Sequence, residues 1–162
     1  MVAASAGILS TNRGLVAEHL AMAWVSEFAG GSDQFELAVC LGDSASDFLY
    51  RMYDDCGGWD KWQGVQVKRV YYKKDARTGK THPTINLVKN GDVRYREGDF
   101  DTVIAVDVKM STVWVLKAQD VCQYKRLRLG RKWDSSSYTI GSGGQIWLQR
   151  SLPAKPALAE PK

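Results

Sequence analysis

The sequence has few of the residues that build disulfide frameworks and zinc sites. Its 162 residues include three cysteines and two histidines. Cys40, Cys56 and Cys122 form no C-x-x-C pair, and neither His19 nor His82 has a second histidine at ligand spacing. We therefore expect neither a disulfide scaffold nor a cysteine or histidine zinc site, in agreement with a reducing, cytoplasmic location.

Long apolar runs are absent as well. No stretch reaches the roughly 18 apolar residues of a membrane-spanning helix, and residues 1–9 lack the basic segment of a secretory signal. These absences predict an intracellular protein that has no membrane partner.

Proline is scarce except near the C-terminus, since residues 153–162 contain three of the four prolines. We expect residues 151–162 to form a disordered tail. The remaining length suits one domain, residues 1–150, and 44% hydrophobic with 25% charged residues is typical of a globular chain.

The positive charge excess is small, +4 with a pI near 9.0, so it permits a polyanionic partner without requiring one. Two basic runs, over residues 73–80 and 125–132, are either phosphate contacts or ordinary solvated segments, and the first is expected to be a loop. The candidate DNA-binding residues are Arg69, Lys73, Lys74, Arg77, Lys80, Lys125, Arg126, Arg128, Arg131 and Lys132.

The stretch 61–72 (KWQGVQVKRVYY) is rich in β-branched and aromatic residues, which predicts a strand. Alternation puts Gln66 and Lys68 on one face, with Val65 and Val67 on the other. Apolar residues on both faces are typical of an interior strand. A lysine there needs an anionic partner, because burying it alone is costly.

A helix is predicted over residues 14–28, capped by Thr11 or Asn12 after a loose lead-in of residues 1–10. On the helical projection Glu18 falls inside the apolar arc. A carboxylate there must be paired, protonated or bound to a cation, so Glu18 is either a functional residue or the partner of a basic side chain.

Two short strands are expected between this helix and residue 61, over residues 34–40 and 47–53, with Asp47 at the mouth of the second. Short loops between them favour an antiparallel meander. Further strands are expected over residues 84–88, 100–108 and 112–116.

These elements supply the parts that metal-assisted phosphodiester hydrolysis needs. Carboxylates hold Mg²⁺ against a phosphate oxygen, the ion lowers the pKa of a bound water, and a lysine orients that water. With Glu18, Asp47 and the V-Q-V-K sequence ending at Lys68, the chain resembles the PD-(D/E)XK nuclease superfamily, and within it the single-domain homing endonucleases, which have a resolvase-like core. The resemblance covers about residues 12–130.

The resemblance implies an α/β (α+β) fold: a restriction-endonuclease-like core whose mixed, mainly antiparallel β-sheet is flanked by helices and carries added β-hairpins. It implies a metal-dependent DNA endonuclease in which Lys68 serves the attacking water. Mg²⁺, or Mn²⁺ in its place, would be held by Asp47, Glu18, Gln66 and the main-chain carbonyl of Val67. Gln66 replaces the commoner glutamate, so the site carries less negative charge. The expected partner is double-stranded DNA, and cutting both strands calls for a homodimer or homotetramer.

Other interpretations stay open at this point. A Holliday-junction resolvase or repair nuclease would share this core, and a non-catalytic nucleic-acid-binding module would use Lys68 only to pair with Glu18. Four further aspartates are alternatives to Asp47 as the metal ligand, although loop acids are usually solvated: Asp43, Asp54, Asp55 and Asp60.

Overall fold

The computed structural model describes residues 3–28, 35–41, 44–53, 57–89, 92–140 and 146–147. Its helices are α1 (Ala3–Phe28), α2 (Ala118–Val121) and the 3-10 helix η1 (Arg131–Ser136). Its strands are β1 (Phe35–Val39), β2 (Phe48–Met52), β3 (Gln63–Arg69), β4 (Tyr71–Lys74), β5 (Thr81–Asn86), β6 (Thr102–Asp107), β7 (Thr112–Lys117), β8 (Arg126–Arg128), β9 (Ser137–Ile140) and β10 (Ile146–Trp147).

The strands form two sheets. Among the described residues, the larger has seven strands in the order β1-β2-β3-β6-β7-β9-β10, of which β3 and β6 pair in parallel and the other neighbours are antiparallel. The smaller has the order β4-β5-β8 and is antiparallel. The predicted meander of the first three strands is confirmed. The strands expected over residues 100–108 and 112–116 are β6 and β7, which pair as an antiparallel hairpin.

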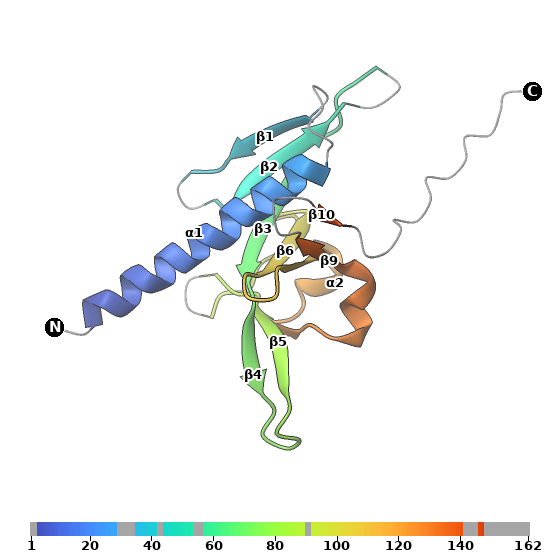
Figure 1. Cartoon of the computed structure of the whole chain (residues 1–162). Coiled ribbons are helices and arrows are strands. Elements are labelled where there is room, and N and C mark those ends of the chain that lie inside the picture. Colours follow the sequence, from blue (N-terminus) through green and yellow to red (C-terminus); the bar gives the residue numbers. More distant parts are fainter. Residues whose placement is uncertain are drawn as a thin grey trace, which may run out of the picture.

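Helix α1 crosses one face of the larger sheet (Figure 1) and buries Ala17, Ala21, Trp24 and Val25 against it. Val65 and Val67 of β3 face this helix, as the alternation of the sequence predicts. A second hydrophobic cluster, which includes Val103, Leu116 and Leu127, covers the opposite face. The sheet therefore has apolar clusters on both sides, which agrees with the nearly continuous apolar run Val103–Val106 in β6.

The prediction for the start of the first helix is wrong. Helix α1 begins at Ala3 and continues through Thr11, Asn12 and Gly14, without a break at the expected cap. The alanines that precede Thr11 favour the helix, and their propensity outweighs the capping signal. No helix within the described ranges combines the length and the hydropathy needed to cross a membrane.

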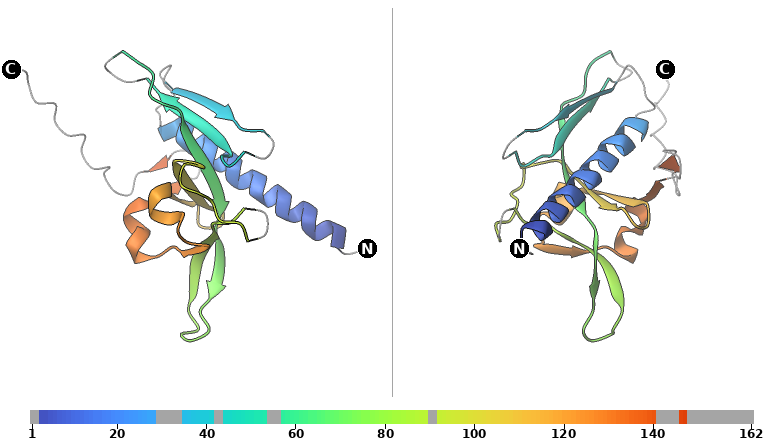
Figure 2. Two further views of the ribbon diagram at one scale, coloured as in Figure 1. Left: turned by 180° about the vertical axis from the view of Figure 1, so that it is seen from behind. Right: turned by 60° about the vertical axis from the view of Figure 1, so that its left-hand side comes forward.

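The strand predicted over residues 61–72 is divided between the two sheets. Val70 donates its backbone N–H to the carbonyl of Val106, and the chain then leaves β6 to pair as β4 with β5. Lys73 and Lys74 lie in β4, so the loop predicted over residues 73–80 is confined to the turn after Lys74. Both views of Figure 2 show β4 and β5 extending as a ribbon beyond the larger sheet. The predicted tail, residues 151–162, lies outside the described residues.

Gly64 of β3 lies where two other segments of the chain approach it closely. A Cβ at this position would lie 2.6 Å from Ser46 Oγ and 3.4 Å from Phe100 Cα. Its N–H donates to Asp101 Oδ2 at 2.7 Å, and the backbone of Asp101 donates in turn to the carbonyl of Gly64 at 2.9 Å. This contact closes the start of β3 against the segment that leads into β6.

We expect Gly64→Ala to lower the free energy of unfolding by about 1 to 3 kcal/mol, because the added methyl overpacks the contact with Ser46. Urea unfolding measures this loss. Gly130→Ala is the matched control, since no atom lies within 4 Å of a Cβ at Gly130. Adding Ser46→Ala to Gly64→Ala removes the clashing oxygen and should recover part of the loss, whereas strictly additive effects would disprove the contact.

Candidate active site

The candidate site lies where β2 separates from β3. Pairing between these strands ends at Phe48 and Val65, so the following residues of β3 have no partner from β2. Asp47 occupies this position: its N–H donates to the carbonyl of Val65 at 2.8 Å, and its Oδ2 accepts the N–H of Val67 at 2.5 Å. The Asp47 carboxylate thus replaces a strand partner at the open edge of β3.

Gln66 lies beside this carboxylate and is 5% exposed. Its Nε2 donates to Asp47 Oδ2 in a short hydrogen bond, and to the carbonyl of Val67 at 3.3 Å. The Val67 carbonyl therefore points toward the same open edge as its N–H. Three oxygen-bearing groups, the Asp47 carboxylate, the Gln66 amide and the Val67 carbonyl, meet at one point.

Glu18 and Lys68 both lie close enough to the Asp47 carboxylate to affect its pKa. Burial raises the pKa of Asp47 from 3.8 to about 6, against the effect of its hydrogen bond from Val67. The neighbouring Glu18 carboxylate raises this pKa further, and the Lys68 ammonium lowers it. Glu18 is half-buried on α1. The helix and the two strands therefore contribute charged groups that interact with one another, and their role as a catalytic site stays a prediction.

Lys68 is half-buried, and burial lowers its pKa while Asp47 and Glu18 oppose that shift. Its Nζ donates to the hydroxyl of Tyr95 at 2.7 Å and lies 4.9 Å from the centre of the tyrosine ring. Burial, followed by the charges of Asp47 and Asp99, raises the pKa of Tyr95 to about 12. Tyr95 is thus a neutral partner that holds the lysine on the same face of the sheet as Gln66.

Tyr95 is absent from the site expected from the sequence. It lies in an irregular segment between the exposed Arg94 and Arg96, where neither strand nor helix periodicity marks it as inward-facing. Its burial, 8% exposed, arises from edge-on packing against Phe100 with ring centres 4.9 Å apart. The signal in the sequence was weak: Tyr95 is an aromatic residue near the strand β6, which begins directly after Asp101.

The ligand set is unusual in its charge. Within the described ranges no three histidine, cysteine, aspartate or glutamate residues gather as they would around a metal ion. Asp47 and Glu18 supply two carboxylates, and the other candidate ligands are the neutral oxygens of Gln66 and Val67. An all-oxygen set of this kind suits a hard cation such as Mg²⁺.

The alternative aspartates differ in their surroundings. Asp60 is exposed beyond the end of β2, whereas Asp43, Asp54 and Asp55 lie outside the described residues. Asp101 accepts the N–H of Gly64 through its Oδ2 and so holds the start of β3, which is a structural function.

Most of the predicted DNA-binding residues gather on and around the smaller sheet. Arg69 ends β3, and Lys73 and Lys74 belong to β4. The turn after β4 carries Arg77 and Lys80. Lys125 precedes β8, and its Nζ lies 3.4 Å from the Asp92 carboxylate. Strand β8 carries Arg126 and Arg128, and η1 contains Arg131 and Lys132. The side chain of Arg131 lies outside the described residues. Whether any of these residues contacts DNA stays a prediction.

One solved structure with this architecture is that of a bacterial homing endonuclease, I-Ssp6803I. The two structures have a TM-score of 0.56 and 20% sequence identity, over 75% of this chain and 78% of the other. A comparison with protein families finds no match, and neither does a comparison with curated proteins. The similarity concerns the fold: a mixed, mainly antiparallel sheet with helices, consistent with a restriction-endonuclease-like fold.

The raised pKa of Asp47 predicts a pH dependence of stability in EDTA. Because the folded-state pKa, about 6, lies above the unfolded value of 3.8, the folded chain holds this proton more tightly, and stability falls as the pH rises through that interval. Asp47→Asn should remove this fall and stabilise the protein above pH 7 by on the order of 1 kcal/mol, after allowance for screening at a half-buried group.

Denaturant unfolding of the parent and of Asp47→Asn across this pH range measures the effect. Asp60→Asn, at an exposed carboxylate, is the control and should keep the parent profile. If the unfolding free energies of the parent and of Asp47→Asn change with pH in the same way, burial does not raise the pKa of Asp47.

Proposed function

We propose that this chain is a metal-dependent DNA endonuclease that hydrolyses phosphodiester bonds, and specifically a site-specific homing endonuclease that makes double-strand breaks. One observation carries the proposal. Asp47, Gln66 and Lys68 converge at the open edge of β3 within electrostatic reach of Glu18, in a fold similar to that of a homing endonuclease.

The donor set fits Mg²⁺, with Mn²⁺ as a substitute. The Glu18 carboxylate is close enough to raise the pKa of Asp47, and a divalent cation would relieve that repulsion. The Val67 carbonyl already points toward Asp47. A half-turn of the Gln66 amide about its last bond exchanges Nε2 for Oε1 and turns a donor into a ligand.

The bound ion would polarise a phosphate oxygen and lower the pKa of a water beside it. Lys68 can donate up to three hydrogen bonds, and only one of them goes to Tyr95. The remaining two are available to orient an attacking water and to stabilise the charge that develops on the phosphate. Tyr95 keeps the ammonium from collapsing onto Asp47, which would otherwise neutralise the metal ligand.

A single site of this kind cuts one strand, so cleavage of a duplex calls for a homodimer or homotetramer with double-stranded DNA bound between the sites. Helix α1 offers an interface. Its N-terminal half extends beyond the sheet (Figure 1), and Leu15 and Val16 are 49% and 47% exposed there.

Plasmid nicking tests the proposal. With Mg²⁺ the parent should convert supercoiled plasmid to nicked and linear forms, and EDTA should abolish this activity. Asp47→Ala and Lys68→Ala should each lower the rate at least about a hundredfold, since each removes a group that acts on the reacting phosphate. Lys61→Ala, an exposed lysine two residues before β3, is the control and should cut as the parent does. Nicking that persists in both Asp47→Ala and Lys68→Ala would refute the assigned site.

Gln66→Glu tests the unusual ligand set. A third carboxylate should lower the Mg²⁺ concentration for half-maximal nicking by about tenfold, because it adds charge where the ion binds. Without metal the same variant should lose about 1 to 3 kcal/mol of unfolding free energy, since it replaces a donor to Asp47 with a like charge. Both the Mg²⁺ requirement and the stability without metal are therefore expected to fall, and an unchanged Mg²⁺ requirement would exclude Gln66 as a ligand.

A further inference from the structure

The smaller sheet has two chemically different faces. Paired residues of neighbouring strands point to the same side, so the registers of β4 with β5 and β5 with β8 define each face. Ile85 and Leu127 point inward and are buried in the hydrophobic core. The outward face is polar and carries Lys73, His82, Asn86, Arg126 and Arg128.

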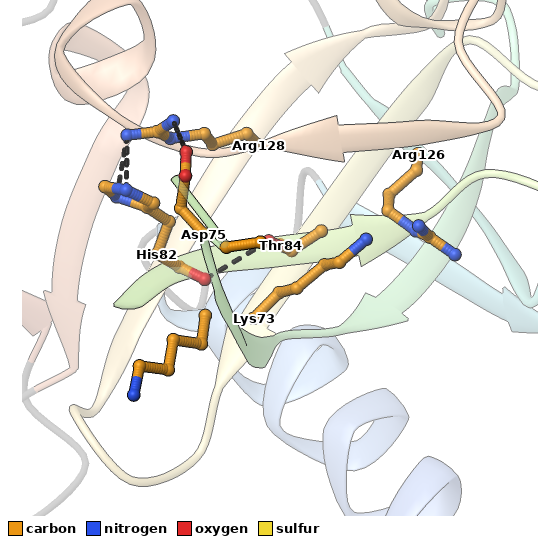
Figure 3. Close-up of a pocket in the computed structure, with 8 residues that line it drawn as sticks. Lys73, Asp75, His82, Thr84, Arg126 and Arg128 are labelled. Carbon is orange, nitrogen blue, oxygen red and sulfur yellow. Dashed lines mark hydrogen bonds and ion pairs between the residues drawn. The ribbon is translucent and has the colours of Figure 1, made fainter. Parts of the chain in front are cut away.

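A hollow of about 400 Å³ opens on this outward face (Figure 3). Its charged lining consists of four basic side chains and one carboxylate: Lys73, Lys74, Arg126, Arg128 and Asp75. An open, mostly basic surface on a protruding ribbon suits an extended polyanion better than a small ligand, which would need an enclosed site.

The two arginines of β8 are in different states. Arg128 lies 3.7 Å from the Asp75 carboxylate, and its Nη2 lies 2.8 Å from Nδ1 of His82. Arg126 donates only its Nε, to Asn86 Oδ1 at 3.4 Å, so its two terminal amino groups have no partner among the described residues. Tyr71 donates to the same oxygen at 2.7 Å and fixes the amide. Arg126 is thus oriented and free, whereas Arg128 is already engaged.

We propose that the outward face of β4-β5-β8 docks in the major groove of duplex DNA, with Arg126 and Lys73 as the direct contacts, while Asp75 keeps Arg128 engaged. The inference rests on the proposed function and assigns the surface that holds its substrate. Three strands span about 10 Å, two intervals of about 4.8 Å. The major groove of B-form DNA, about 12 Å wide, admits a β-ribbon, whereas the major groove of duplex RNA is too narrow and deep.

Fluorescence anisotropy with a labelled linear DNA duplex in EDTA measures docking without cleavage. Arg126→Ala should weaken binding by about tenfold or more, the effect of losing a forked arginine contact, and Lys73→Ala should lower the salt slope of binding by about 1. Lys61→Ala is the matched control: it removes the same charge as Lys73→Ala but at the opposite end of β3, roughly 40 Å of extended chain away.

Asp75→Asn should strengthen DNA binding, in contrast to Arg126→Ala. The Asn oxygen can still accept the turn hydrogen bonds from the N–H groups of Arg77 and Thr78, now made to Asp75 Oδ1, while the charge that holds Arg128 is lost. Binding should become severalfold tighter. Asp60→Asn removes the same charge at the far end of β3 and should change binding by less than about twofold.

The outcomes separate this inference from the proposed function. If Arg126→Ala and Lys73→Ala bind DNA as tightly as the parent while the parent still nicks plasmid with Mg²⁺, the docking surface is wrong and the proposed function stands. If the parent neither binds nor nicks DNA, both fail. Competition by an RNA duplex as strong as that by the DNA duplex overturns docking in the major groove.

Discussion

The hydrogen bond between the Asp47 carboxylate and the backbone N–H of Val67 is the interaction on which the candidate site depends. Strand β2 stops pairing with β3 at Val65. The next N–H on that edge of β3, which belongs to Val67, therefore has no partner from β2. A buried N–H must be satisfied, and here a side chain satisfies it. The same contact holds a carboxylate, an amide and a carbonyl oxygen together at the edge of a sheet whose two faces are otherwise closed by hydrophobic clusters.

The charged side chains around the open edge of β3 interact with one another. Burial raises the pKa of Asp47 to about 6 despite the hydrogen bond from Val67, and the neighbouring Glu18 contributes in the same direction. A glutamate in place of Gln66 would add a third carboxylate to an already crowded cluster, whereas the amide donates to Asp47 and stabilises its ionised form. Tyr95 keeps the Lys68 ammonium nearby without an ion pair to the ligands. The arrangement is costly without a cation, which is typical of sites built for binding rather than for stability.

Strand alternation carried most of what the sequence could predict. It placed Gln66 and Lys68 on one face of β3 and the valines on the other, because side chains alternate with a period of two. Tyr95 escaped prediction because it lies in an irregular segment, where no periodicity marks it as buried against Phe100. The ribbon of β4 and β5 escaped for a related reason: Lys73 and Lys74 are exposed strand residues, and their charges resemble those of a loop. The start of α1 was misjudged because a local cap signal competes with the propensity of a whole turn.

The most direct test of the central claim is a crystal structure of the protein with Mn²⁺ and its anomalous difference map. The account predicts one ion at the open edge of β3, within about 2.3 Å of oxygens from Asp47 and from the Val67 carbonyl, the range expected for a hard divalent cation with oxygen ligands. An anomalous map with no peak at that edge, or with a peak held by other residues, would contradict it.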